Sequence, residues 1–217
     1  MSYTGDVQVG GPADTRTAGD LQITKIAVGP MENNAYLLRC STTGDQVLID
    51  AADDADRLLA EIGSGGLTQV VTTHRHPDHW QALAAVVEAT GARTVAGVDD
   101  AEGIDVPIDH PVAPGARVGV GTCELEVIQL VGHTPGSIAL AYDDPDGVVH
   151  LFTGDSLFPG GVGKTWSEED FTRLLEEVET KLFDRFGDDT WFYPGHGGDS
   201  TLGAERPDLA AWRERGW

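Results

Sequence analysis

The sequence predicts an α/β (α+β) protein in which two mixed β-sheets pack together with helices on their outer faces. The predicted strands come in two batches, and helices follow the strands of each batch. A sheet must bury its apolar faces against another layer, which two packed sheets with outer helices achieve. Four consecutive predicted strands near the middle of the chain have no helix between them, which disfavours a doubly wound sheet.

The first 20 residues are rich in Gly, Thr and Asp and show no apolar periodicity. We therefore expect residues 1–20 to form a flexible lead-in. Residues 21–217 contain no internal repeat and no linker, so we expect them to form a single domain.

The predicted strands are short apolar runs between turns that contain Gly, Pro or Asp. In the first part of the chain they are Leu21–Val28, Ala35–Cys40, Gln46–Asp50 and Gln69–Thr73. From the middle onward they are Arg93–Ala96, Arg117–Val120, Cys123–Val131, Ser137–Tyr142, Val148–Thr153 and Thr190–Tyr193.

The predicted helices carry apolar residues at the helical period. In the first helix, Leu58, Leu59 and Ile62 lie on one face, and Gly63 follows the last of them. Ser167 with Asp170 is a typical start signal for the third helix. The expected helices span about residues 53–62, 79–90, 168–183 and 207–215.

The charge of the chain disfavours several classes of partner. It has 36 acidic and 14 basic residues and a net charge of -22. Because a strongly acidic surface repels polyanions, we expect no nucleic acid and no anionic membrane as partner. No apolar run reaches the roughly 18 residues of a membrane span.

Targeting and cysteine features favour a cytoplasmic protein. Residues 1–20 lack the basic start and the apolar stretch of a signal peptide. Cys40 and Cys123 form no CxxC pair, so we expect both to be small buried residues rather than parts of a disulfide scaffold. The sequence leaves the oligomeric state open.

The histidines are unevenly distributed along the chain. Three of the seven, His74, His76 and His79, lie within six residues at the end of a predicted strand, and Asp78 accompanies them. Imidazoles and carboxylates are the usual ligands of zinc and similar divalent ions. Alternation along an extended segment places His74 and His76 on one side, and the first helical turn brings Asp78 and His79 back toward the same centre.

Three further loops each place one polar residue beside glycine at the end of a predicted strand. They carry His133, Asp155 and His196. Together with the dense cluster, these residues are too many for one closed tetrahedral site but suit two ions that share a carboxylate, with Asp155 as the bridge. His110 and His150 lie outside this pattern and are expected to be structural or surface residues.

These segments resemble the metallo-β-lactamase superfamily, specifically its glyoxalase II-like metal-dependent hydrolases. The resemblance covers nearly all of the chain from Leu21 onward and includes residues 32–37 and 47–50. It implies a four-layer αβ/βα sandwich, the metallo-β-lactamase fold, which agrees with the predicted layers.

The resemblance also implies roles for individual residues. The matching metal ligands are His74, His76 and His133 for a first ion, Asp78, His79 and His196 for a second ion, and Asp155 as the bridge. Of these, Asp78, His79 and Asp155 are also expected to be catalytic. Zinc is the expected metal, with iron or manganese as alternatives.

Other positions narrow the expected substrate. Many β-lactam-hydrolysing members have a cysteine at the place of Asp155, so its absence disfavours that activity. Lys164 matches a cation that contacts the substrate carboxylate in thioesterases of the family. A P-loop around Gly163-Lys164-Thr165 is excluded because Phe158 stands where that motif requires its first glycine. Classical glyoxalase II has a C-terminal helical extension that grips glutathione, and we expect no counterpart here because 21 residues follow His196.

The expected reaction is hydrolysis of a small acyl-thiol thioester by a hydroxide that bridges two divalent ions. A small-molecule thioester is therefore the expected partner. The main alternative is a persulfide dioxygenase with one iron held by two histidines and an aspartate. A lactonase or another ester hydrolase on the same fold, and a scaffold with a vestigial site, are further alternatives.

Overall fold

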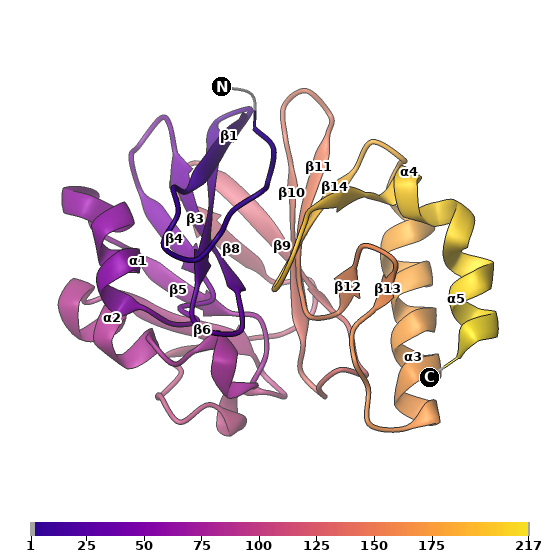
Figure 1. The fold of residues 1–217 in the computed structure, drawn as a ribbon. Helices are drawn as coiled ribbons and strands as arrows, with labels where there is room; N and C mark the ends of the chain where they lie inside the picture. The colour runs from indigo at the N-terminus through magenta and orange to yellow at the C-terminus, as the bar shows by residue number, and fades with distance from the viewer. Residues whose placement is uncertain (1–2, 217) are drawn as a thin grey trace.

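Two mixed β-sheets form the centre of the computed structural model, which describes residues 3–216 (Figure 1). The strands of the first sheet, in spatial order, are β1 (Asp14–Ala18), β2 (Leu21–Val28), β3 (Asn33–Cys40), β4 (Gln46–Ile49), β5 (Gln69–Thr72), β6 (Arg93–Gly97) and β7 (His110–Val112). Those of the second are β15 (Ser200–Thr201), β14 (Trp191–Pro194), β11 (Val149–Gly154), β10 (Ile138–Asp143), β9 (Cys123–Gln129) and β8 (Arg117–Val120). A separate hairpin joins β12 (Leu157–Phe158) and β13 (Gly161–Val162).

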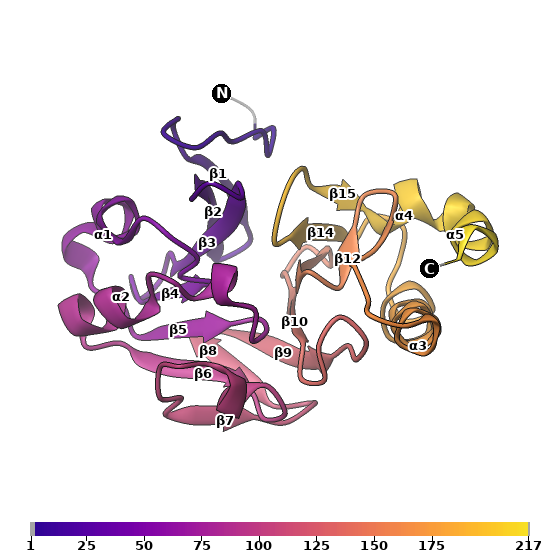
Figure 2. The same cartoon turned by 60° about the horizontal axis from the view of Figure 1, so that its bottom comes forward.

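Helices cover the outer face of each sheet, as Figure 2 shows from a second side. The helices on the first sheet are α1 (Ala55–Ile62) and α2 (Leu83–Thr90). Those on the second are α3 (Glu168–Val178), which continues as a π-helical turn (Glu179–Phe183), α4 (Leu202–Glu205) and α5 (Leu209–Arg215). Short 3-10 turns span Gly63–Gly65, Pro77–His79, Ala101–Gly103 and Arg206–Asp208. No helix within residues 3–216 has the length and apolar character to cross a membrane.

Three buried apolar clusters hold the layers together. The first lies between the two sheets and contains Leu38, Phe152 and Tyr193. The other two lie under the outer helices, where Leu58 of α1 and Leu174 of α3 point toward their sheets. This layering confirms the predicted αβ/βα sandwich, because each apolar sheet face is covered by another layer. Cys40 and Cys123 are buried and free, as expected.

The sequence prediction is wrong for part of the N-terminal segment. Within residues 1–20, where no regular structure was predicted, β1 pairs antiparallel with β2. Its polar sequence, Asp-Thr-Arg-Thr-Ala, lies at the edge of the sheet and is mostly solvent-facing, so it carries little apolar signal. The short elements β7, β12, β13, β15 and α4 were also not predicted.

The second predicted helix begins later than expected. His79 lies in the 3-10 turn Pro77–His79, and α2 starts only at Leu83. This 3-10 turn still brings Asp78 and His79 back beside the end of β5, as the predicted metal site requires. The third predicted helix is continuous through α3 and the π-helical turn.

Candidate metal centre

The seven predicted ligands come together at one edge of the sandwich, on loops that follow four strands. These are the loop after β5 with His74, His76, Asp78 and His79, and the loops after β9, β11 and β14 with His133, Asp155 and His196. Each of these loops begins where a strand ends, so the four loops lie together at this edge of the sandwich. The residues form three overlapping groups whose ligand atoms lie within 4.8 Å of one another.

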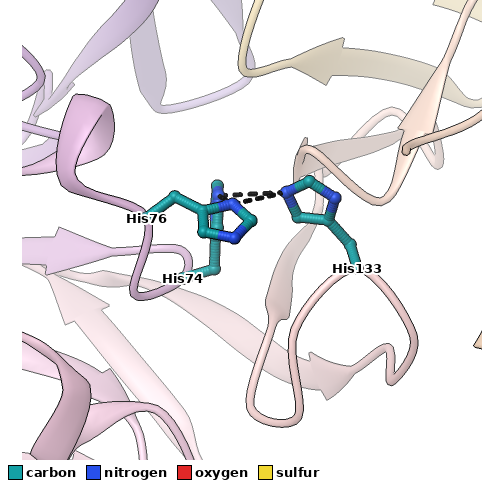
Figure 3. A group of neighbouring side chains, drawn as sticks. All are labelled: His74, His76 and His133. Atoms are coloured by element: carbon teal, nitrogen blue, oxygen red, sulfur yellow. Dashed lines mark hydrogen bonds between the residues drawn. The ribbon is translucent and has the colours of Figure 1, made fainter. Parts of the chain in front are cut away.

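His74, His76 and His133 form a site of three nitrogen atoms (Figure 3). The distances are 3.1 Å from His74 Nε2 to His76 Nδ1, 2.9 Å from His76 Nδ1 to His133 Nε2, and 3.3 Å from His133 Nε2 to His74 Nε2. Tetrahedral zinc with bonds of about 2.0–2.1 Å would separate its nitrogens by about 3.3 Å. Burial lowers the pKa values of all three rings, so they are neutral and able to bind a metal ion.

Asp78, His79 and His196 form a second site beside the first. Asp78 Oδ2 lies 3.4 Å from Nε2 of His79 and 3.4 Å from Nε2 of His196. Asn33 Nδ2 donates to the same carboxylate oxygen at 2.9 Å. This set of two imidazoles and one carboxylate suits a zinc-like ion with an open coordination position.

Asp155 lies between the two sites. Its Oδ1 is 3.4 Å from His79 Nε2, and its Oδ2 is 3.6 Å from His196 Nε2 and 3.7 Å from His133 Nε2. Burial would raise the pKa of Asp155, but the adjacent His196 and His79 rings hold it well below its usual range. Asp155 Oδ1 and His79 Nε2 are buried without a hydrogen-bond partner among the described residues. Such orphaned atoms are costly unless a ligand satisfies them, so this donor set fits a bridged pair of metal ions.

The carboxylates around the second site raise the pKa values of its two histidines. Burial would lower the pKa of His79, but the Asp50 and Asp155 carboxylates raise it to about 10. In His196, burial is likewise outweighed by the nearby Asp155 and Asp78 carboxylates, which raise the pKa to about 9. The carboxylates therefore attract positive charge to the second site, in contrast to the neutral imidazoles of the first.

Hydrogen bonds to the far side of several of the rings orient the other nitrogen toward the centre. Asp50 Oδ2 lies 2.8 Å from Nδ1 of His79, and Asp50 also accepts from Thr73 N at 2.7 Å. The rings of His133 and His196 are oriented in the same way by backbone carbonyl groups. Such partners fix the tautomer and orientation of metal-binding histidines.

Asp50→Asn is expected to weaken metal binding at the second site about 10- to 100-fold. The asparagine amide can still orient His79, but it lacks the negative charge of the carboxylate. The measurement is a zinc titration against a chromophoric chelator. Asp56→Asn, at an exposed position of α1, serves as the control and should leave both affinities unchanged. Equal affinities in Asp50→Asn and the unmodified protein would contradict this role.

Gly195 has no side chain, and the space beside it is occupied by the side chains of Asp155 and His79. A Cβ atom at this position would overlap Asp155 Oδ1 and would lie 2.7 Å from His79 Cε1. Contacts below 3.0 Å force one of the groups to move. The glycine in this loop is therefore needed for the close approach of β14 to the centre.

Gly195→Ala is expected to lower turnover about 100-fold, because displacing ligands by about 1 Å has effects of this size. Gly198→Ala is the matched control, since a Cβ atom there has nothing within 4 Å. The two variants should therefore differ in kcat while both retain the circular-dichroism spectrum of the parent. Similar turnover in both would show that the space at Gly195 is unimportant.

Lys164 lies near the centre through its backbone and its side chain. Its carbonyl oxygen is 2.6 Å from His133 Nδ1, and its Nζ lies 4.5 Å above the centre of the Trp166 ring. Trp166 is exposed and packs edge-on against His76. A cavity of about 270 Å³ opens there, lined by His76, His133, Trp166 and the side chains of Arg75 and Arg173.

Sequence reasoning missed the residues that orient the ligands. Asp50 and Asn33 lie in segments noted only as strands, and each reaches a ligand that is distant along the chain. Asp50 could have been recognised in the sequence, because it is a carboxylate directly after an apolar strand, as Asp155 is. The two histidines outside the pattern were predicted correctly: His110 is exposed on β7, and His150 is buried against Tyr193.

Comparisons with known proteins agree with this geometry. Residues 28–197 match the model of the metallo-β-lactamase superfamily. A hydroxyacylglutathione hydrolase of Polaromonas sp. (strain JS666 / ATCC BAA-500) is 37% identical over 166 residues, which are 76% of this chain and 62% of that protein. Among solved structures, ETHE1 from Myxococcus xanthus has a TM-score of 0.73 at 29% identity, covering 87% of this chain and 84% of that one. The BLEG-1 B3 metallo-β-lactamase has a TM-score of 0.74 at 26% identity, covering 85% and 96%.

The two packed sheets carry at their edge a His/Asp cluster that can hold divalent metal ions. The chain belongs to the metallo-β-lactamase superfamily. Its similarity to hydroxyacylglutathione hydrolases makes it glyoxalase II-like within that family. The chain spans 62% and 51% of the length of two of these curated relatives.

Proposed function

We propose that the protein hydrolyses the thioester bond of a small acyl-thiol, with two divalent ions held by the seven clustered side chains. The position of Asp155 between a three-nitrogen site and a second site is the observation that carries this proposal. Relatives named hydroxyacylglutathione hydrolase support a hydroxyacyl thioester as the substrate class. Zinc is the proposed metal because the donor set contains only imidazoles and carboxylates in tetrahedral spacing.

The ions would supply Lewis acidity and a water of lowered pKa. The residues of the chain hold and orient the reacting groups around them. With two dications bound, their four positive charges would outweigh the two negative charges of Asp78 and Asp155, and the centre would be electropositive inside an acidic protein. A small carboxylate-bearing substrate is therefore attracted to the centre, although the net charge of -22 repels large polyanions.

The cavity beside His76 and His133 is the proposed position of the substrate. The exposed Trp166 offers an apolar surface for the acyl-thiol, and Arg75, Arg173 and Asp170 are the charged residues that line the cavity. Lys164 adds a positive charge over the Trp166 ring. We propose Lys164 as the residue that contacts a substrate carboxylate. In this position the thioester carbonyl would lie beside the first metal site, whose ligands His76 and His133 line the cavity.

A persulfide dioxygenase is the second candidate. His74, His133 and Asp155 present two imidazoles and one carboxylate around a common point, which is the arrangement of mononuclear non-haem iron oxygenases. Asp78, His79 and His196 would then have no metal to bind. Their complete second site favours the hydrolase.

The test is a panel of substrates assayed with zinc-loaded and iron-loaded protein. It contains S-lactoylglutathione, a neutral acyl thioester, a lactone, a β-lactam and glutathione persulfide. We expect thioester hydrolysis to exceed every other activity. Oxygen uptake with the persulfide in the iron-loaded protein, without thioester hydrolysis in either form, would replace the proposal with the dioxygenase.

A further inference from the structure

A lysine is fully buried between the two sheets, close to the loop that carries His196. Lys25 of β2 is 0% exposed, and Leu21 and Ile23, which lie on the same face of the strand, belong to the apolar cluster between the sheets. Alternation along the strand would therefore place an apolar side chain at position 25. Burying the charged ammonium group of Lys25 there costs free energy unless each of its protons has a hydrogen-bond partner. A lysine at this position therefore indicates a specific role.

All three protons of the Lys25 ammonium group have a partner. Nζ donates to Asp199 Oδ1 at 2.7 Å, to the Gly197 carbonyl at 2.7 Å and to the Gly5 carbonyl at 2.9 Å. Tyr3 closes the network by donating its hydroxyl to Asp199 Oδ2 at 2.6 Å. The network thus joins β2, the N-terminal segment and the residues directly after His196.

The first sheet also binds the backbone on the other side of His196. Asn34 N donates to the Gly195 carbonyl at 2.7 Å, and Tyr36 Oη donates to the Pro194 carbonyl at 2.6 Å. Asn34 Nδ2 adds bonds to the carbonyls of Pro194 and Gly197. The loop between β14 and β15 is therefore fixed to β2 and β3 at points before and after His196 (Figure 2).

The three-nitrogen site has separate supports. Asp50 holds the backbone of Thr73, and the buried Asp100 accepts from Arg75 N and from Thr134 Oγ1 beside His133. None of these bonds involves Lys25 or Asp199. Loss of the Lys25 network should consequently affect His196 without moving the histidines of the first site.

We propose that Lys25 and Asp199, closed by Tyr3, are positioning residues for His196 and so set the metal affinity of the second site while leaving the first unchanged. The inference rests on the ligand assignment of His196 in the proposed function. It assigns a role to the N-terminal segment, which lies outside the matched family region of residues 28–197.

The test measures zinc bound per chain as a function of free zinc, by equilibrium dialysis with elemental analysis. The variant Lys25→Met/Asp199→Asn removes both charges together, so no unpaired charge remains buried. We expect two ions per chain in the parent protein, and in the variant an unchanged first affinity with a second affinity about 10- to 100-fold weaker, the size of effect that orienting partners have. The ring signals of His196 in an NMR spectrum should shift as well.

The control is Arg206→Met/Asp188→Asn, which removes another ion pair whose arginine binds backbone carbonyl groups, those of Phe183 and Phe186. It should keep both zinc affinities. Tyr3→Phe removes a single bond from the network, and we expect it to weaken only the second ion, by a smaller factor.

Two results would overturn the inference while the proposed function stands. One is a folded Lys25 variant with both affinities unchanged, and the other is an equal loss of both ions in this variant. If that variant does not fold, an unchanged second affinity in Tyr3→Phe decides against the inference. A parent protein that binds fewer than two ions would instead contradict the proposed function, and the positioning role with it.

Discussion

His74→Ala is expected to lower kcat/KM for the thioester by about 1,000-fold or more while the protein remains folded. The side chain supplies one of the three nitrogens of the first site and lies within 4.8 Å of the ligand atoms of His79 and Asp155. Metal-ion catalysis contributes several kcal/mol, and about 4 kcal/mol corresponds to about 1,000-fold in rate. Initial rates at saturating and limiting substrate give kcat and kcat/KM.

The control for this prediction is His110→Ala, since His110 is exposed on β7 outside the cluster. It should retain the activity of the parent. Retained turnover in a folded His74→Ala variant would show that the three-nitrogen site has no part in the reaction.

Asp155→Asn should reduce kcat by about 100-fold or more and should lower the zinc bound at both sites. The carboxylate faces His79 with one oxygen and His133 and His196 with the other, so it is shared by the two sites. The amide keeps the shape of the side chain but loses the charge that offsets two dications. Elemental analysis and initial rates on the same sample measure both effects.

Asp189→Asn is the matched substitution at an exposed aspartate. It should change neither the zinc content nor kcat. If Asp155→Asn lost zinc from one site only, the bridging role would be wrong even though the site as a whole remained.

The sequence predicted the site more completely than the contacts that support it. His74, His76, Asp78 and His79 are close along the chain, so their spacing alone shows that they converge. The positions of His133, Asp155 and His196 followed from a shared local pattern of a polar residue beside glycine after a strand. Both signals are local, and local patterns can be recognised without the fold.

The supporting contacts are not local. Lys25 and Asp199 are 174 positions apart, and Asn33 and Asp78 are 45 apart. Nothing in the residues around Lys25 indicates its partners, because they are a carbonyl and a carboxylate of a distant loop and one carbonyl of the N-terminal segment. The strand β1 escaped prediction for a related reason, since its pairing with β2 stabilises a polar segment that has no apolar pattern of its own.

The most direct test of the two-ion account is a zinc titration of chelator-treated protein with S-lactoylglutathione hydrolysis as the readout. The account predicts no turnover without metal and full activity only when about two equivalents of zinc are bound per chain, as the two sites with a shared carboxylate require. Full thioesterase activity in the metal-free protein would contradict the account, and so would saturation of activity at one equivalent.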